Sequence, residues 1–341
     1  MKKTQLLLYI TLLLSILLTG CNTGAKTEDD PNKINVVATI FPQYDYVRQI
    51  AGENVDLKLL LPPGAESHSY EPTPRDIIDI QNSDIFIYVG GESDAWIEDI
   101  LSSMDTSNMQ MIALMDCVDA VEEELVEGMQ AHEHEEDGHA HDDEHVHDAE
   151  EVHEEEDSEV HHAEEAEYDE HVWTSPKNAI LITEKITEAL QSADVANAAV
   201  YADNSTAYIE QLKTLDAQFE AVVDQAARKV MVFGDRFPMR YFADAYGLTY
   251  YAAFPGCAAE SEPSAATISF LINEVKAEQI PVVFHIEFSN EKVADAICES
   301  TEAKKLLFHS CHNVSSEDLS AGVTYVSLMQ ENMKNLKEAL Q

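Results

Sequence analysis

The chain has 341 residues and a formal net charge of −45 at pH 7, from 65 acidic residues against 20 Lys and Arg. This balance argues against a nucleic-acid partner, because phosphate binding needs a basic surface, and it favours a cationic ligand. The hydrophobic content of 45% is ordinary for a globular protein, and the length allows two domains.

The N-terminus has the pattern of an export signal. Lys2 and Lys3 precede an apolar stretch over 6–18, which is too short for a permanent membrane helix and ends in Leu-Thr-Gly-Cys at 18–21. This ending resembles a bacterial lipobox. We expect residues 1–20 to be a lipoprotein signal peptide, Cys21 to carry lipid such as palmitate, and 21–33 to be a tether. The protein would lie on the extracytoplasmic face of the cell membrane. The alternative is an ordinary secretory signal with a chance cysteine.

Strand patterns then alternate with helix patterns. Strands are predicted over 34–40, 55–61, 84–89 and 109–114, and helices over 44–51, 74–82 and 93–103. This alternation predicts a parallel sheet of the α/β class, in which ligands bind at loops that leave the carboxyl ends of strands. His68 lies on such a loop.

An acidic and histidine-rich run interrupts the alternation. Residues 122–170 contain 24 acidic residues and no Lys or Arg. Such a run cannot build an apolar core, so we expect 122–167 to be a disordered insertion within an N-terminal lobe over 34–190. Imidazole and carboxylate groups bind divalent cations. The accessory metal-binding candidates are His132, His134, His139, His141, His145, His147, His153, His161 and His162.

Order resumes at His171, just before the helix start formed by Ser175 and Pro176. An apolar stripe then predicts one long linking helix within 191–228. A second α/β lobe over 229–341 follows. Its strands are predicted over 230–233, 250–254, 280–284 and 305–308, and its helices over 239–246, 263–277, 290–300 and 322–340.

Two loops resemble the motifs of a known family. Residues 64–73 read Gly-Ala-Glu-Ser-His-Ser-Tyr-Glu-Pro-Thr, and residues 169–176 read Asp-Glu-His-Val-Trp-Thr-Ser-Pro. They are similar to the histidine motifs of metal-binding receptor lipoproteins of bacterial ABC importers for zinc and manganese, the cluster A-I solute-binding proteins. Glu170 stands where that family usually has Pro. The resemblance extends over about 34–340. It implies two α/β lobes joined by one long rigid helix, with a metal in the interlobe cleft.

The resemblance also implies two histidine ligands from the N-terminal lobe and two ligands from the C-terminal lobe. The first pair corresponds to His68 and His171. In the C-terminal lobe the pattern departs from the family, and Asp235 is the expected third ligand, with an N-cap or an ion pair to its neighbour as the alternative. The fourth ligand is expected to be His309, with His312 close behind. His285 or Glu287 could support the ligands.

Two cysteines fall on C-terminal loops near this expected site. Cys257 and Cys311 are expected to form a disulfide, because pairing is allowed outside the cytoplasm. The alternative is that Cys311 is a thiolate ligand.

Three nitrogens and one carboxylate would suit Zn²⁺ in tetrahedral geometry, with Mn²⁺ as runner-up. We expect a monomeric zinc receptor that delivers Zn²⁺ to an ABC importer permease driven by a separate ATPase, because the sequence has no phosphate-binding loop. The alternatives are a manganese receptor and a surface zinc buffer or metallochaperone. We do not expect an enzyme, since the sequence has no H-E-x-x-H motif.

Overall fold

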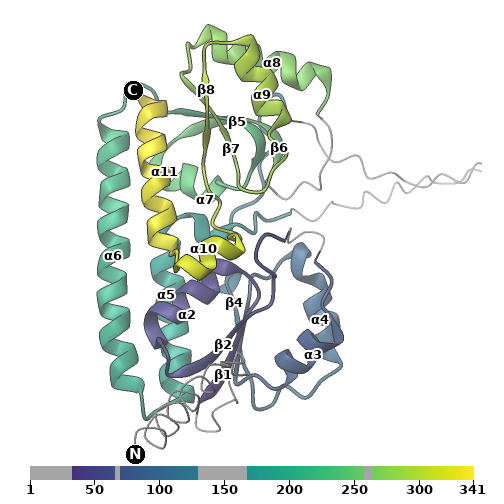
Figure 1. The fold of residues 1–341 in the computed structure, drawn as a ribbon, viewed down its shortest axis with the longest axis vertical. Helices are drawn as coiled ribbons and strands as arrows, with labels where there is room; N and C mark the ends of the chain where they lie inside the picture. The colour runs from purple at the N-terminus through teal and green to yellow at the C-terminus, as the bar shows by residue number, and fades with distance from the viewer. Residues whose placement is uncertain (1–32, 66–69, 130–166, 257–262) are drawn as a thin grey trace, which may run out of the picture. The chain divides into compact units, whose positions relative to one another are not determined.

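The computed structural model describes residues 33–65, 70–129, 167–256 and 263–341, and the chain from Ile34 to Gln341 forms one compact unit. Its N-terminal lobe holds a sheet of parallel strands in the order β2-β1-β3-β4. The strands are β1 (Ile34–Ala38), β2 (Val55–Leu59), β3 (Ile85–Tyr88) and β4 (Gln110–Ala113). The parallel α/β fold expected from the sequence is confirmed (Figure 1).

Helices cover this first sheet. They are α2 (Phe41–Ala51), α3 (Pro74–Gln81), α4 (Ala95–Ser102) and α5 (Pro176–Ala193), with short 3-10 turns η1 (Glu92–Asp94), η2 (Met115–Cys117) and η3 (Val172–Thr174). Helix α3 begins as its sequence predicts. The Thr73 hydroxyl accepts from the Asp76 amide at 3.3 Å, and the Asp76 carboxylate accepts from the Thr73 amide at 3.0 Å. This reciprocal cap satisfies two amides that the first helical turn leaves without partners.

The long helix α6 (Ala198–Asp224) contacts both lobes. It packs on α2 and α5 at one end, and on α7 (Arg240–Tyr246) and α11 (Tyr325–Leu340) at the other. Figure 1 shows it running along one side of both sheets. Its buried stripe includes Tyr208, Leu212 and Phe219. A single helix of this length is a stiff connection between the lobes.

The C-terminal lobe repeats the architecture, with parallel strands in the order β6-β5-β7-β8. The strands are β5 (Val230–Phe237), β6 (Thr249–Pro255), β7 (Val282–His285) and β8 (Lys304–Leu307). The helices besides α7 and α11 are α8 (Ala265–Ala277), α9 (Lys292–Ser300) and α10 (Ser316–Ala321).

Two elements of this lobe differ from the sequence prediction. Strand β5 runs on to Phe237 through a register shift after Phe233, so it is longer than predicted. Helix α10 was not predicted, and Gly322, with φ +76°, ends it. The terminal helix therefore begins at Tyr325 rather than at Gly322.

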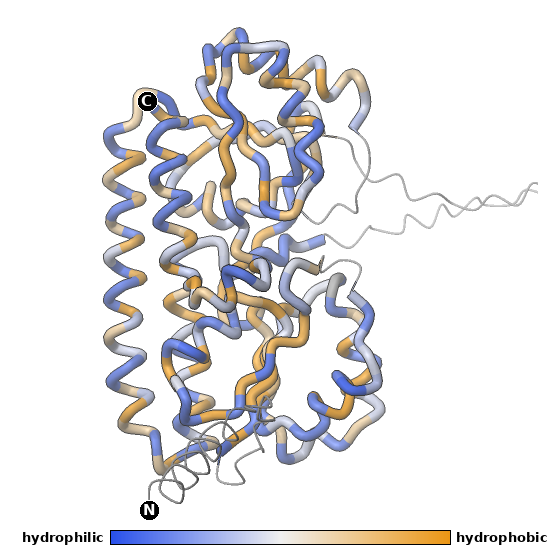
Figure 2. Tube along the Cα trace, viewed as in Figure 1, coloured by the Kyte–Doolittle hydropathy of each residue, from blue (hydrophilic) through white to orange (hydrophobic). Residues whose placement is uncertain are grey.

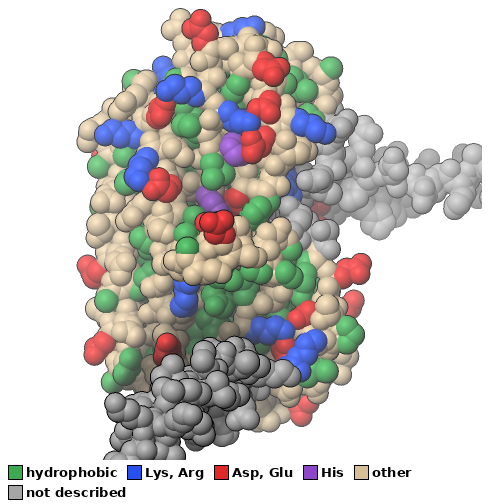
Figure 3. Space-filling view, in the orientation of Figure 1, with side chains coloured by type: hydrophobic (Ala, Val, Ile, Leu, Met, Phe, Trp, Pro, Cys, Tyr) green, Lys and Arg blue, Asp and Glu red, His purple; other side chains and the backbone are tan. Residues whose placement is uncertain are grey.

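Hydrophobic packing is continuous from one lobe to the other. One cluster of buried side chains includes Trp173 of the N-terminal lobe and Phe308 and Tyr325 of the C-terminal lobe. Figure 2 shows hydrophobic residues gathered along the strands of the N-terminal sheet. On the face in Figure 3, basic and acidic side chains lie side by side over the C-terminal lobe. An ion pair of this lobe joins Lys304 to Glu338. Such surface pairs contribute little to stability.

The first residues of the expected insertion are part of the folded unit. Glu122 and Tyr168 form an antiparallel bridge, and the Asp169 amide donates to the Val121 carbonyl at 2.9 Å. Glu124 also forms an ion pair with Arg240 of the C-terminal lobe. The prediction that disorder begins at residue 122 is wrong for 122–129, because backbone pairing and a basic partner stabilise this acidic segment. Residues 130–166 lie outside the described residues.

Candidate metal centre

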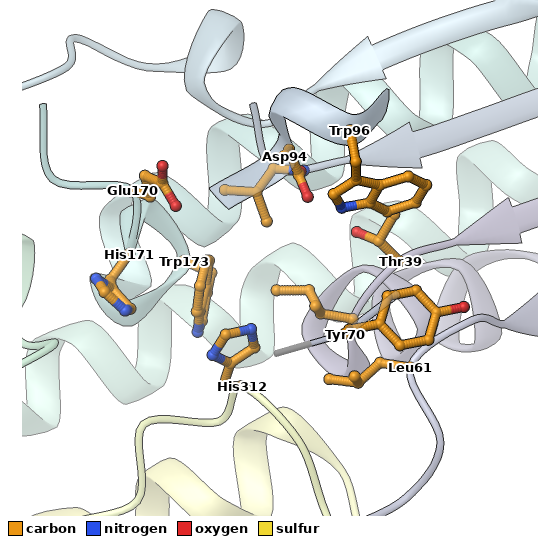
Figure 4. A pocket seen from close by; sticks show the side chains of 11 residues that line it. Thr39, Leu61, Tyr70, Asp94, Trp96, Glu170, His171, Trp173 and His312 are labelled. Atoms are coloured by element: carbon orange, nitrogen blue, oxygen red, sulfur yellow. The ribbon is translucent and has the colours of Figure 1, made fainter. Parts of the chain in front are cut away.

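A cavity lies where the carboxyl ends of the N-terminal strands face a loop of the C-terminal lobe (Figure 4). It is lined by Thr39, Ile40, Leu61, Tyr70, Val89, Asp94, Trp96, Glu170, His171, Trp173 and His312. The N-terminal lobe provides all of these residues except His312, which follows β8. This is the edge of a parallel sheet at which ligands are expected.

His171 is fixed at the start of η3 and is 2% exposed. Its backbone amide donates to Asp169 Oδ1 at 2.8 Å, and its ring Nδ1 lies 3.1 Å from the same oxygen. The Tyr241 hydroxyl donates a hydrogen bond of 2.7 Å to the Asp169 carbonyl. A carboxylate on Nδ1 selects the tautomer in which Nε2 can bind a cation, an arrangement common behind metal-binding histidines.

The charge around His171 also affects its proton. Burial alone lowers the pKa of His171, but the nearby charge and hydrogen bond of Asp169, together with the charges of Glu170 and Glu123, raise it above the ordinary histidine value. The surroundings therefore favour a positive charge at this ring. A bound cation would benefit from the same carboxylates.

His312 meets His171 across the cavity. The centroids of the two rings are 6.2 Å apart, and the Trp173 ring lies 5.1 Å from that of His312. The loop is held in place because the His312 carbonyl accepts from the Phe41 amide at 3.2 Å. The structure thus brings one histidine from each lobe into one cavity.

His309, the favoured candidate from the sequence, does not line this cavity. Its Nδ1 accepts from the Cys311 amide at 2.9 Å, and its backbone is clamped by Asn332 through two hydrogen bonds of 2.7 Å. Glu287 approaches its ring and also accepts from the Ser310 amide at 2.7 Å. His309 therefore shapes the loop, whereas His312 faces the cavity.

Asp235 also lies away from the cavity lining. Its carboxylate accepts from the backbone amides of Arg236 at 2.9 Å and Ile286 at 3.1 Å. It joins the irregular part of β5 to the chain that follows β7. Burial raises the pKa of this carboxyl group, and the backbone amides counteract that effect. Asp235 therefore does not line the cavity, and the ligand role expected for it stays a prediction.

The predicted disulfide is not formed, because Cys311 is a free and fully buried thiol. It lies among α2, α6 and α11, close to Tyr46, Tyr208 and Tyr325, and burial raises its pKa well above the usual thiol value. A thiolate ligand at this position is disfavoured for the same reason. Cys257 lies outside the described residues.

Several other candidates also lie outside the described residues: Cys21, His68, and the histidines at 132, 134, 139, 141, 145, 147, 153, 161 and 162. The chain on both sides of His68 is nevertheless tied to this region. Tyr70 lines the cavity, and the Ala65 carbonyl accepts from the Asn313 side chain at 2.9 Å. His285 does not line the cavity, and its Nδ1 lies 3.0 Å from the carbonyl oxygen of Ile286.

Two carboxylates at the cavity were missed from the sequence. Asp94 Oδ2 accepts from the amides of Val89 at 2.8 Å and Gly90 at 3.0 Å. Burial raises the Asp94 pKa to about 6, the two amides lower it, and Glu170 adds to the rise. The signal for Asp94 was its place near the start of the helix that follows β3. For Glu170 it was the departure from the usual histidine motif.

Among the described residues, no group of three His, Cys, Asp or Glu side chains is close enough together to hold a metal ion. His171 and His312 are therefore a partial site of two nitrogens, with carboxylates beside them. No helix within the described parts of the chain is long and apolar enough to cross a membrane.

The model of one protein family, described as "Zinc-uptake complex component A periplasmic", matches residues 36–339. The chain belongs to this zinc-uptake family. The family expected from the two histidine motifs is therefore confirmed.

Among sequence relatives, the zinc-binding lipoprotein AdcA of Streptococcus pneumoniae is 30% identical over 339 residues, covering 99% of this chain and 61% of the relative. The chain thus spans about three-fifths of the length of the first curated relatives it matches. The high-affinity zinc uptake system protein ZnuA of Bacillus subtilis is 29% identical, covering 94% of this chain and 91% of that protein.

Two solved structures are also similar. The Zn(II)-bound ZnuA-like domain of Streptococcus pneumoniae AdcA has a TM-score of 0.68 at 26% identity, covering 90% of this chain and 99% of that one. The metal-dependent lipoprotein YcdH of Bacillus subtilis has a TM-score of 0.70 at 26% identity, covering 91% of this chain and 100% of that one. These likenesses agree with the two-lobed fold.

Proposed function

We propose that this zinc-uptake family member is an extracytoplasmic receptor that binds Zn²⁺ in the interlobe cavity and delivers it to an ABC importer permease. The observation that carries the proposal is the pairing of His171 and His312, one from each lobe, in that cavity. His68 is proposed as a further ligand. Zn²⁺ is the cargo of this receptor, and imidazole nitrogens are among its preferred ligands.

The residues behind the histidines support this function. The Asp169 carboxylate contacts the Nδ1 of His171, and the Trp173 ring packs against the ring of His312. A cation bound between lobes would stabilise the arrangement in which both histidines meet. The stiff helix α6 restricts the motions by which the lobes could separate, so release would involve small movements rather than a wide hinge.

The partners and the location are also part of the proposal. A lipid on Cys21 would anchor the receptor as a monomer to the extracytoplasmic face of the membrane. The permease would be driven by a separate ATPase, since no phosphate-binding loop occurs in this sequence. The names of the relatives, zinc-binding lipoprotein and zinc uptake protein, support these assignments.

Calorimetric titration of the metal-stripped protein with Zn²⁺ tests the proposal. The protein is expected to bind one Zn²⁺ tightly, and His171→Ala is expected to abolish that event. His285→Ala is the matched control, because His285 does not line the cavity. Tight zinc binding that survives in His171→Ala would disprove the proposed site.

Deletion of residues 130–166 separates the receptor from a surface zinc buffer. The tight site is expected to survive this deletion while weaker binding events disappear. Loss of all tight binding would instead favour the buffer. Titration with Mn²⁺ tests the manganese receptor, which predicts tighter binding of Mn²⁺ than of Zn²⁺.

A further inference from the structure

Glu170 directs a buried carboxylate toward the cavity that contains His171 and His312. Its side chain and those of the two histidines line the same space (Figure 4), and Glu170 is 6% exposed. Among the described residues that line this cavity, none is Lys or Arg. The cavity therefore combines imidazole nitrogens with carboxylate oxygens, the donor types that divalent cations bind, although no three of the described side chains are close enough together here to hold one.

The fold makes room for this carboxylate at Gly91. A Cβ atom added to Gly91 would lie 2.5 Å from Glu170 Oε1 and 2.9 Å from its carboxyl carbon. Gly91 also has a φ of +88°, a backbone conformation that residues other than glycine rarely adopt. The loop after β3 thus packs its bare backbone against Glu170. The Glu170 carboxylate is therefore buried against the backbone of a glycine.

The backbone fixes Glu170 relative to His171. The Glu170 carbonyl accepts from the Val172 amide at 2.8 Å, and the next residue is anchored by Asp169. Two adjacent side chains are therefore presented from one rigid turn. Glu170 and His171 therefore both approach the cavity from this turn.

We propose that Glu170 supplies a carboxylate oxygen ligand to the metal and thereby sets its metal preference. This inference rests on the proposed function of the cavity. Asp235, the carboxylate expected from the C-terminal lobe, does not line the cavity, and its oxygens accept from backbone amides. Glu170 provides a carboxylate from the N-terminal lobe. Because carboxylates suit Mn²⁺ better than imidazoles do, Glu170 also favours Mn²⁺ relative to a site of histidines alone.

Glu170→Gln tests the assignment, since it removes the charge and keeps the size. The metal-stripped protein is titrated with Zn²⁺ and Mn²⁺, and its Co²⁺ complex is followed by visible absorption. We expect zinc affinity to fall at least about tenfold, manganese affinity to fall further, and the Co²⁺ bands to shift. Glu92→Gln is the matched control, because Glu92 is exposed on the same loop as Gly91 and lies outside the cavity lining.

Two results would overturn the assignment: a zinc affinity of Glu170→Gln equal to that of Glu92→Gln, or an unchanged Co²⁺ spectrum. If Glu170→Gln fails to fold, Glu170→Asp replaces it, and its shorter reach is expected to weaken zinc binding and shift the bands. The failure of the proposed function is distinguishable, because it appears as tight zinc binding in His171→Ala.

Discussion

The indole nitrogen of Trp173 donates a hydrogen bond of 2.9 Å to the carbonyl oxygen of Ser310, which joins the two lobes beside the cavity. Trp173 also accepts from the Tyr325 hydroxyl through its own carbonyl at 2.8 Å. One side chain thus connects the motif of His171 to the loop of His312. All three of Trp173, His171 and His312 line the same cavity.

The first prediction concerns this connection. Trp173→Phe removes the donor to Ser310 and leaves a buried carbonyl with one partner fewer, so we expect the free energy of unfolding to fall by about 1–3 kcal/mol. Zinc affinity is expected to fall as well, because the His312 loop loses an anchor. Chemical denaturation and zinc titration measure the two effects. Trp96→Phe, at another wall of the same cavity, is the control and should reduce zinc affinity less.

The second prediction separates the two histidines of the C-terminal loop. His312→Ala is expected to lower zinc affinity at least about tenfold, whereas His309→Ala should leave it nearly unchanged. His309→Ala removes the acceptor of the Cys311 amide and is expected to destabilise the fold by about 1–2 kcal/mol. Titration calorimetry and thermal unfolding give the two readouts. The reverse order of zinc affinities would show that His309 is the ligand.

The third prediction concerns pH. Zinc needs a neutral imidazole, so protons compete with it, and the raised pKa of His171 makes this competition begin at a higher pH than for an ordinary histidine. We expect zinc affinity to fall as the pH decreases. Asp169→Asn removes the charge that raises the pKa, so the fall should move to lower pH. Zinc titrations from about pH 8 to about pH 5 measure the shift. An identical pH profile for Asp169→Asn would contradict this prediction.

The fourth prediction concerns the stability of the metal-free protein. The pKa of Asp94 is raised to about 6 in the folded state, so folding disfavours its charged form. The resulting loss of folding stability is absent below the pKa of the unfolded state. It increases between about pH 4 and about pH 6 and is constant at higher pH. Asp94→Asn keeps an oxygen for the Val89 and Gly90 amides and should stabilise the protein by about 1–2 kcal/mol near neutral pH. Thermal unfolding of both proteins should show no gain near about pH 4.

The sequence was sufficient for much of the fold because its signals are local. Thr73 caps one helix and Pro176 opens another as predicted, although the Ser175 side chain makes no cap hydrogen bond, and the alternation of apolar strands with helices predicted the parallel sheets. Helix α10 was missed because a segment that short carries little periodicity. The extension of β5 was missed because it contains Gly234, Asp235 and Arg236, which are unusual in a strand interior.

The candidate site was less predictable because it depends on side-chain direction. Asp235 and His309 both follow strand patterns, as ligands should, but backbone amides occupy the Asp235 carboxylate and the His309 Nδ1. His312 reaches the cavity only because its loop folds back toward Phe41. The sequence showed Glu170 as a departure from the family's histidine motif. Its burial against the backbone of Gly91 is a tertiary contact that the sequence did not predict.

The backbone hydrogen bond between the Asp169 amide and the Val121 carbonyl joins the two ends of the histidine-rich segment. The length of that segment can therefore change without a change in the geometry of the cavity. A second backbone hydrogen bond lies next to it, in which the Glu123 amide donates to the Glu167 carbonyl at 2.9 Å. Residues can therefore be gained or lost between these points at little entropic cost and without moving His171. A change in the number of histidines between these points is therefore expected to leave the position of His171 unchanged.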